Sequence, residues 1–266
     1  MKIKVNQVDY YVKVSGRGQP TWLLLHGFMG SQQDFATVAA HLPGTIISVD
    51  LLGHGQSTPV DAPECYTMPV QAEDLRQLLL QLSITQPINL VGYSMGGRLA
   101  LYFALQYPQM LAHLFLESCT AGIADPKERA QRRAHDQQQA QQLLQAPLVE
   151  FVDAWEQLPL FKSQRNLDPA IQQQIRQQRL AQDPRALAAS LLGMGTGSMP
   201  NLWPRLANLA IPTTLITGAK DPKFHNLAQK MASLLPNNQW KEVPTAGHNV
   251  HAEQPTAYVR ILRESI

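Results

Sequence analysis

The stretch 89–97 constrains the fold more than any other part of the chain, with the sequence NLVGYSMGG. A short apolar run ends in Gly-x-Ser-x-Gly and a helical pattern follows at once, which is the strand–turn–helix context of a nucleophile elbow. Such a turn demands glycine at Gly92 and Gly96, because a Cβ atom there would collide with neighbouring backbone. It places the hydroxyl of Ser94 at a helix N-terminus, where free N–H groups stabilise negative charge. The stretch therefore predicts a reactive serine on a strand-and-helix scaffold.

Two further residues have the positions that an activated serine requires. Asp221 follows the strand-like run Thr213–Thr217, and His248 lies in an Ala-Gly-His-Asn segment after the last such run. Serine is a weak nucleophile or base until a partner removes its proton, and a carboxylate holds that partner in the right tautomer. The order Ser…Asp…His is the chain order of α/β-hydrolases. We therefore predict that Ser94, Asp221 and His248 are catalytic and meet at the carboxyl edge of a sheet.

Other residues compete for the roles of base and acid. His251, three residues after His248, is an alternative base, and Glu117, at the end of the sixth strand-like run, is an alternative acid. Asp50 is a weaker alternative acid, because it precedes the serine in the chain, and we expect its glycine-rich turn to shape a loop.

Apolar runs alternate with helical patterns along most of the chain. Ile3–Val5 and Tyr10–Val14 alternate in the manner of an antiparallel hairpin. Six later runs are short and mostly apolar, as in parallel strands buried on both faces: Trp22–Leu25, Thr45–Val49, Ile88–Val91, Leu111–Glu117, Thr213–Thr217 and Gln239–Val243. Helical patterns between them cover about Ser31–His41, Met68–Leu82, Met95–Tyr107, Phe224–Leu235 and Ala252–Arg263. This alternation predicts an α/β fold with a mostly parallel, doubly wound sheet.

The alternation stops between about Gly122 and Pro204. This stretch is helical in pattern, rich in Gln and Arg, and too long for a loop. We interpret residues 122–204 as a helical lid inserted into an α/β-hydrolase core of residues 1–121 and 205–266. A lid excludes water and adds substrate contacts; the alternative is a packing insertion without such a role.

Composition narrows the range of partners. The net charge is +2 and charge runs are absent, which favours neither a nucleic-acid nor a membrane partner. No apolar run approaches the roughly 18–20 residues that span a bilayer, and no N-terminal signal is visible.

Cys65 and Cys119 match neither a disulfide framework nor a zinc motif, so we expect a reduced, cytoplasmic setting. The chain has no metal cluster and no Gly-x-Gly-x-x-Gly turn, so we expect no metal and no other cofactor. The oligomeric state stays open, with a monomer or a weak dimer expected.

Groups near the serine predict sites that can bind negative charge. The loop after the first buried strand contains His26-Gly27-Phe28, and in this fold that loop supplies an oxyanion N–H. We therefore predict an oxyanion hole formed by the backbone N–H groups of Phe28 and Met95, with His26 shaping the turn. Arg98 lies four residues after Ser94 on the same helix face. It can bind a substrate carboxylate with paired N–H donors, or form an ion pair on the helix surface.

Together these segments resemble one enzyme family, the 2-succinyl-6-hydroxy-2,4-cyclohexadiene-1-carboxylate synthases of menaquinone biosynthesis. Arg98 directly after the elbow glycines, with the lid arginines and Trp155, is the most specific part of the resemblance. The matching segments are 26–31, 92–98, 128–133 with Asp136, 155–161, 218–224 and 247–251.

The resemblance implies a lyase. Family members use the Ser–His–Asp triad as a base that abstracts a ring proton from 2-succinyl-5-enolpyruvyl-6-hydroxy-3-cyclohexene-1-carboxylate, and pyruvate is expelled. The residues that match the family's substrate-binding positions are Tyr93, Arg98, Arg132, Trp155 and Arg179. The sequence around Arg179 is divergent, which leaves Arg133 and Arg176 as alternatives.

Two other functions remain compatible with the sequence. A hydrolase of the same fold, acting on esters or on C–C bonds of keto acids, could use the same three residues. A binding module that has lost its activity is the other alternative, and the intact Ser–Asp–His set argues against it.

Overall fold

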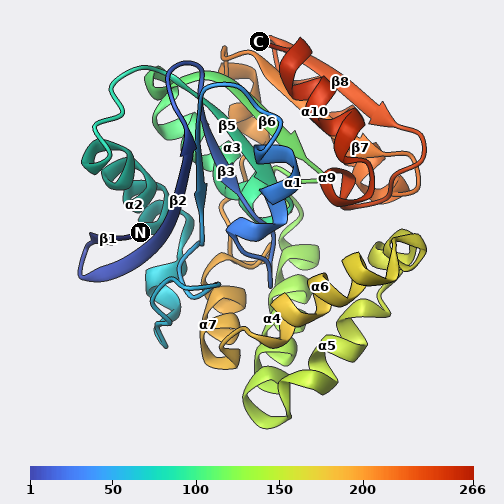
Figure 1. The fold of residues 1–266 in the computed structure, drawn as a ribbon. Helices are drawn as coiled ribbons and strands as arrows, with labels where there is room; N and C mark the ends of the chain where they lie inside the picture. Colours follow the sequence, from blue (N-terminus) through green and yellow to red (C-terminus); the bar gives the residue numbers. More distant parts are fainter.

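The computed structural model describes residues 1–266, which fold around one eight-stranded sheet (Figure 1). The strands are β1 (Lys2–Val5), β2 (Val8–Gly16), β3 (Thr21–Leu25), β4 (Thr45–Val49), β5 (Ile88–Tyr93), β6 (Leu111–Glu117), β7 (Thr213–Gly218) and β8 (Asn238–Val243). Their order across the sheet is β1-β2-β4-β3-β5-β6-β7-β8. The pairs β1–β2 and β2–β4 are antiparallel and all the others are parallel. The predicted mostly parallel sheet is confirmed.

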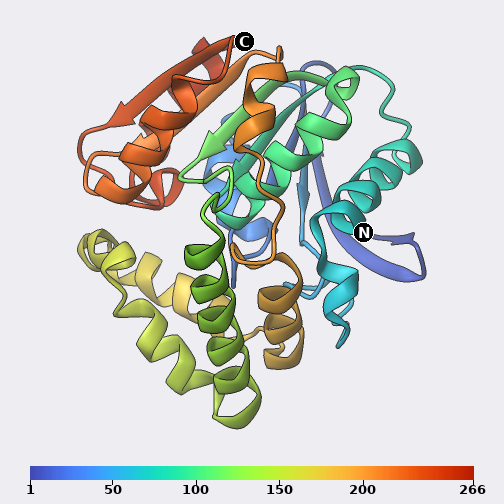
Figure 2. The same ribbon diagram turned by 180° about the vertical axis from the view of Figure 1, so that it is seen from behind.

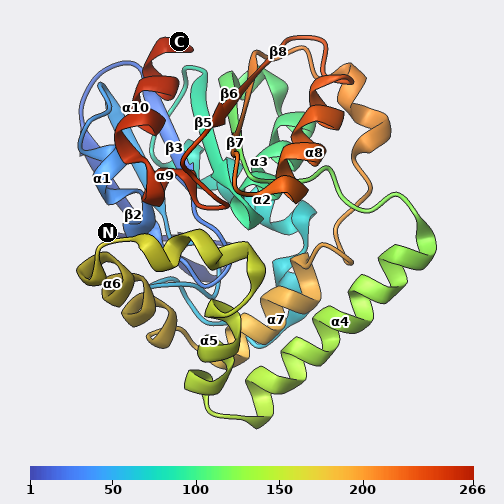
Figure 3. The ribbon, with the colours of Figure 1, turned by 90° about the vertical axis from the view of Figure 1, so that its right-hand side faces the viewer.

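Helices cover both faces of this sheet (Figure 3). On one face lie α2 (Met68–Gln81), α3 (Met95–Gln106) and α8 (Pro222–Ala232), and on the other lie α1 (Ala36–Ala39), α9 (Val250–Glu253) and α10 (Pro255–Glu264). Successive side chains of a strand point to opposite faces. Leu23 and Leu25 accordingly pack against the first layer, whereas Trp22 and Leu24 pack against the second. Every residue of β3 is buried, as expected for a parallel strand covered on both sides.

Two expected helices differ from the observed ones. The pattern at Ser31–His41 becomes a 3₁₀ turn, η1 (Gln32–Phe35), followed by the short α1. The turn begins at a capping box, in which the side chains of Ser31 and Asp34 bond to each other's backbone N–H groups. The pattern at Ala252–Arg263 divides into α9 and α10, because Pro255 lacks an N–H group and the residue before it leaves the helical conformation.

Residues 122–204, which we call the lid, contain helices and no strand. These helices are α4 (Pro126–Gln145), α5 (Leu148–Glu156), the 3₁₀ helix η4 (Pro159–Asn166), α6 (Pro169–Leu180) and α7 (Pro184–Met194); another 3₁₀ helix, η5 (Trp203–Asn208), leads back to β7. The helices α4 to α7, drawn in green to gold, gather below the sheet in the view of Figure 2. A small apolar cluster, which includes Leu143, Phe151 and Leu187, joins the lid to Met29 of the core. None of the helices is both long enough and apolar enough to cross a membrane.

The turn between β5 and α3 is held by close backbone contacts. Ser94 has φ 49° and ψ −103°, in a region that residues other than glycine rarely adopt. Its N–H donates to the carbonyl of Glu117 at 2.9 Å. A Cβ atom at Gly92 would lie 2.5 Å from the carbonyl oxygen of Gly96, and one at Gly96 would lie 2.4 Å from that of Leu25. The predicted need for glycine at both positions is confirmed.

Replacing Gly96 by alanine should therefore destabilise the fold. The new methyl group would meet two backbone carbonyls, at 2.4 and 2.5 Å, which cannot move aside like a flexible side chain. We expect Gly96→Ala to lower the free energy of unfolding by about 3 kcal/mol or more. Gly18→Ala is the control, because its Cβ would meet nothing within 4 Å although φ is +83°, and it should cost only about 1 kcal/mol. Urea unfolding measures both, and equal losses in the two variants would contradict the collision.

Candidate active site

Three side chains from separate loops form one hydrogen-bonded chain. Ser94 lies in the turn between β5 and α3, Asp221 is the N-cap of α8, and His248 lies between β8 and α9. His248 Nδ1 is 2.7 Å from Asp221 Oδ2, and His248 Nε2 is 3.1 Å from Ser94 Oγ. A carboxylate only accepts hydrogen bonds, so the Nδ1–H donates to Asp221. The Nε2 lone pair then accepts from the Ser94 hydroxyl, which is the arrangement in which serine can lose its proton.

The alternative base and acid bond to each other instead. His251 Nδ1 is 2.7 Å from Glu117 Oε2, and the backbone N–H of His251 donates to Glu117 Oε1 at 3.1 Å. Both side chains are fully buried. The hydroxyl of Ser94 is bonded to His248 and not to this second pair. Asp50 accepts from the backbone N–H groups of Gln32 and Gln56 at 2.6 and 2.8 Å, which fits the loop-shaping role expected for its turn.

The backbone N–H groups of Phe28 and Met95 are free beside the serine. Met95 opens α3, so its N–H has no partner within the helix. Neither N–H donates a hydrogen bond anywhere in the chain, and both residues line the same cavity as Ser94. Two free donors beside a hydroxyl can stabilise an oxyanion.

His26 shapes the loop that carries Phe28. Its Nδ1 donates to the carbonyl of Gly27 at 2.7 Å, and its Nε2 accepts from the N–H of Leu51 at 2.9 Å. This pair of bonds requires a neutral ring, since an imidazolium has no lone pair to accept with. Burial accordingly lowers the pKa of His26 to about 4. The neighbouring His54, with its ring 5.2 Å away, is also buried, and its pKa is lowered to about 3.

A cavity of about 290 Å³ separates the carboxyl edge of the sheet from the lid. It is lined by all the residues predicted to bind substrate: Tyr93, Arg98, Arg132, Trp155 and Arg179. Arg133 and Arg176 do not line it, so of the three alternatives only Arg179 reaches the cavity. His248 and Asp221 are buried and are not part of the lining.

Sequence reasoning missed two charged residues in the lining, Asp34 and Lys223. The capping box that starts at Ser31 is the sequence signal that could have marked Asp34. Burial raises the pKa of the Asp34 carboxyl to about 6, although the charges of His251 and Arg179 oppose this rise. Lys223 directly follows Asp221-Pro222 at the start of α8. Its closeness in sequence to Asp221 is the signal that could have marked it as a residue of the site. No group of three or more His, Cys, Asp or Glu side chains is placed to hold a metal ion.

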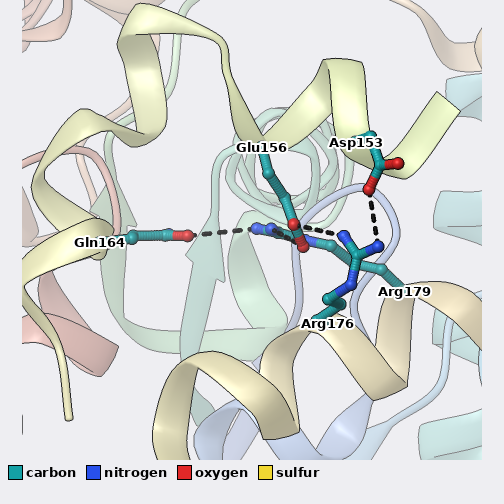
Figure 4. Close-up of polar contacts among 5 residues, drawn as sticks. All are labelled: Asp153, Glu156, Gln164, Arg176 and Arg179. Carbon is teal, nitrogen blue, oxygen red and sulfur yellow. Dashed lines mark hydrogen bonds and ion pairs between the residues drawn. The ribbon is translucent and has the colours of Figure 1, made fainter. Parts of the chain in front are cut away.

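The three cavity arginines have different surroundings. Arg98 is buried, forms no ion pair, and donates from Nη1 to the carbonyl of Met194 at 2.5 Å. Burial lowers its pKa to about 10, which leaves the guanidinium charged at neutral pH. Arg132 pairs with the buried Asp136 at 2.7 Å and is one-third exposed. Arg179 contacts residues of α5 and η4 (Figure 4).

The chain is similar in sequence and in structure to several known proteins. Residues 20–255 match the model of the alpha/beta hydrolase fold family. A putative 2-succinyl-6-hydroxy-2,4-cyclohexadiene-1-carboxylate synthase of Bacillus subtilis is 42% identical over 244 residues, which cover 90% of this chain and 88% of the relative. The structure of MenH from S. aureus superimposes with a TM-score of 0.90 at 36% identity, covering 96% of this chain and 97% of that one. A thermophilic esterase from Thermogutta terrifontis, with malate bound, has a TM-score of 0.86 at 29% identity, covering 99% and 96%.

The shifted pKa of His26 predicts acid sensitivity of the fold. Between pH 6.5 and about 4 the unfolded chain takes up a proton at His26 that the folded chain refuses. The free energy of unfolding should therefore fall as the pH is lowered through this window, by about 3 kcal/mol from His26 alone. Gln in place of His26 retains a donor and an acceptor but does not titrate, so the His26→Gln variant should show a shallower dependence.

Urea unfolding at a series of pH values from 7 to 4 measures this slope. His41→Gln, at an exposed position on the surface, is the matched control and should retain the slope of the unmodified chain. Equal slopes for His26→Gln and the unmodified chain would contradict the account.

Proposed function

We propose that this chain, which belongs to the 2-succinyl-6-hydroxy-2,4-cyclohexadiene-1-carboxylate synthase family of the α/β-hydrolase fold, is a lyase of menaquinone biosynthesis. It converts 2-succinyl-5-enolpyruvyl-6-hydroxy-3-cyclohexene-1-carboxylate into 2-succinyl-6-hydroxy-2,4-cyclohexadiene-1-carboxylate and pyruvate. One observation carries the proposal: a complete Ser–His–Asp chain opens into a cavity lined by three arginines. Free thiols at Cys65 and Cys119 fit a reaction in the reducing cytoplasm.

The triad supplies the base in this proposal. The ring proton of the substrate passes to the Ser94–His248 pair, and the carboxylate of Asp221 stabilises the imidazolium that forms. The electrons of the broken C–H bond first form an enolate with the succinyl ketone. As this enolate collapses, a double bond forms between ring atoms C2 and C3, the existing double bond moves from C3–C4 to C4–C5, and the C5–O bond to the enolpyruvyl group breaks. That group leaves as the enolate of pyruvate and takes up a proton. The 3.1 Å contact between Ser94 Oγ and His248 Nε2 is close enough for this proton transfer.

The two free backbone N–H groups supply the oxyanion hole. Loss of the ring proton places negative charge on the ketone oxygen of the succinyl arm. We assign the N–H groups of Phe28 and Met95 to this oxygen, because both are without acceptors and line the cavity beside Ser94. One such donor typically contributes ~2.7–4 kcal/mol of transition-state stabilisation.

The three arginines of the cavity can balance the negative charge of the proposed substrate. It carries three carboxylates, and moving them out of water without partners would be very costly. Arg98 is a buried cation with no carboxylate of its own, so it is available to one of them. The lid, residues 122–204, adds Arg132 and Arg179 and also Trp155, whose indole Nε1 is buried without a partner. That unused donor and the ring of Tyr93 complete the proposed contacts with the substrate.

A hydrolase is the second candidate function. The same serine could attack an ester carbon or activate water for cleavage of a C–C bond, and the thermophilic esterase is 29% identical with the same fold. The three arginines of the cavity favour an anionic substrate over a neutral ester in either case. The lyase and the hydrolase therefore differ in the reaction they catalyse, and both would bind a negatively charged substrate.

Pyruvate release from freshly prepared enolpyruvyl substrate tests the proposal. The unmodified chain should release one pyruvate for each substrate consumed, and Ser94→Ala should slow this at least about a thousandfold because the base is lost. A neutral aryl ester supplied at ordinary concentrations is the comparison. Rapid turnover of that ester without pyruvate release would favour the hydrolase and contradict the lyase.

A further inference from the structure

Four charged side chains form a chain of contacts across two helices of the lid (Figure 4). Asp153 and Glu156 lie one turn apart on α5, and Arg176 and Arg179 lie one turn apart on α6. Residues three apart share one face of a helix, so two acids of α5 face two bases of α6. We call these four residues the charge chain, in the order of their contacts: Asp153, Arg176, Glu156, Arg179.

The charge chain runs from solvent to the wall of the cavity. The exposed fraction of the side chains falls from 59% at Asp153 to 35% at Arg176, 24% at Glu156 and 10% at Arg179. Only Arg179 lines the cavity. The side chains of the outer three residues do not line the cavity, and their contacts join them to it through Arg179.

Arg179 is held by three protein groups. Its Nη2 donates to Gln164 Oε1 at 3.2 Å, its Nη1 donates to Glu156 Oε1 at 3.1 Å, and its guanidinium carbon lies 5.0 Å from the ring centre of Phe161. A carboxylate can bind a guanidinium through both oxygens at once, which is a strong and specific pairing. Glu156 uses only one oxygen on Arg179.

The other oxygen of Glu156 is held by Arg176. Arg176 Nη1 donates to Glu156 Oε2 at 2.7 Å, which is shorter than the 3.1 Å contact between Glu156 and Arg179. Arg176 is itself anchored by Asp153 Oδ1 at 2.6 Å. Glu156 is thus drawn towards the outer arginine, and the charge of Arg179 is only partly compensated.

We propose that Arg176 is a positioning residue that keeps Arg179 available to a substrate carboxylate. Without Arg176, both oxygens of Glu156 are free to close on Arg179, and Glu156 then competes with the substrate. The inference rests on the proposed function only in taking a carboxylate as the ligand of Arg179. Because Arg176 does not reach the reacting atoms, its loss should weaken substrate capture and leave the chemical step unchanged.

Kinetics of pyruvate release in four variants test this inference. Arg176→Gln should raise KM about threefold to fivefold with kcat within about twofold of the unmodified chain. Adding Glu156→Gln removes the competing carboxylate, so the double variant should recover a KM within about twofold of the unmodified value. Glu156→Gln alone should not raise KM. Arg185→Gln, which removes one exposed lid arginine outside the charge chain, is the matched control and should behave like the unmodified chain.

Rescue by the second substitution distinguishes positioning from a merely structural role. A double variant with a KM as high as that of Arg176→Gln would overturn the proposal, as would a loss confined to kcat. Equal KM values for Arg176→Gln and Arg185→Gln would also overturn it.

Calorimetric titration with malate, a four-carbon dicarboxylate, separates this inference from the proposed function. If the unmodified chain releases no pyruvate, the proposed function fails, but the order of malate affinities across the same variants still tests the charge chain. Weaker malate binding by Arg176→Gln, restored in the double variant, supports it. Equal affinities in all variants, or no malate binding by any of them, contradict it whatever the enzyme does with the enolpyruvyl compound.

Discussion

The left-handed conformation of Ser94 is the constraint on which the rest of the site depends. A non-glycine residue in such a conformation costs about 1–3 kcal/mol, and here it is held by the approach of Gly92 to the backbone of Gly96 and by the bond from the Ser94 N–H to β6. From this one turn follow the direction of the hydroxyl and the free N–H of Met95. The position of Arg98, one helical turn further on, follows as well. The turn between β5 and α3 therefore fixes these groups of the site, and the lid supplies the rest of the cavity wall.

Much of this could be predicted from the sequence, because strong local signals coincide with the elements that carry the site. Leu111–Glu117 and Thr45–Val49 were expected with the bounds they have, since short apolar runs in this fold lie between clear turn signals. Contacts between distant segments could not be predicted. Nothing local indicates that Glu117 and His251, 134 residues apart, bond to each other. Nor does a helical pattern show which of Arg176 and Arg179 reaches the cavity, because that depends on how α6 packs against α5.

The carboxyl edge of the sheet thus carries two acid–imidazole pairs with different surroundings. His248 extends from Asp221 to the serine, whereas His251 lies against the rings of Phe35 and Tyr93, with centroids 4.2 and 4.9 Å away. The first pair can move a proton to or from a substrate, and the second packs beneath the residue that precedes the serine. In the proposed reaction Arg98, Arg132 and Arg179 favour the binding of carboxylates beside the first pair, because they offset the cost of removing carboxylates from water.

The most direct test of this division is to replace each acid by its amide and compare kcat for pyruvate release at saturating substrate. Circular dichroism of both variants first establishes that they are folded. Asp221→Asn should lower kcat by about 10³–10⁴-fold, because His248 loses its orienting partner. Glu117→Gln should lower kcat by about tenfold or less, because its imidazole does not reach the serine. A greater loss from Glu117→Gln than from Asp221→Asn would contradict the account.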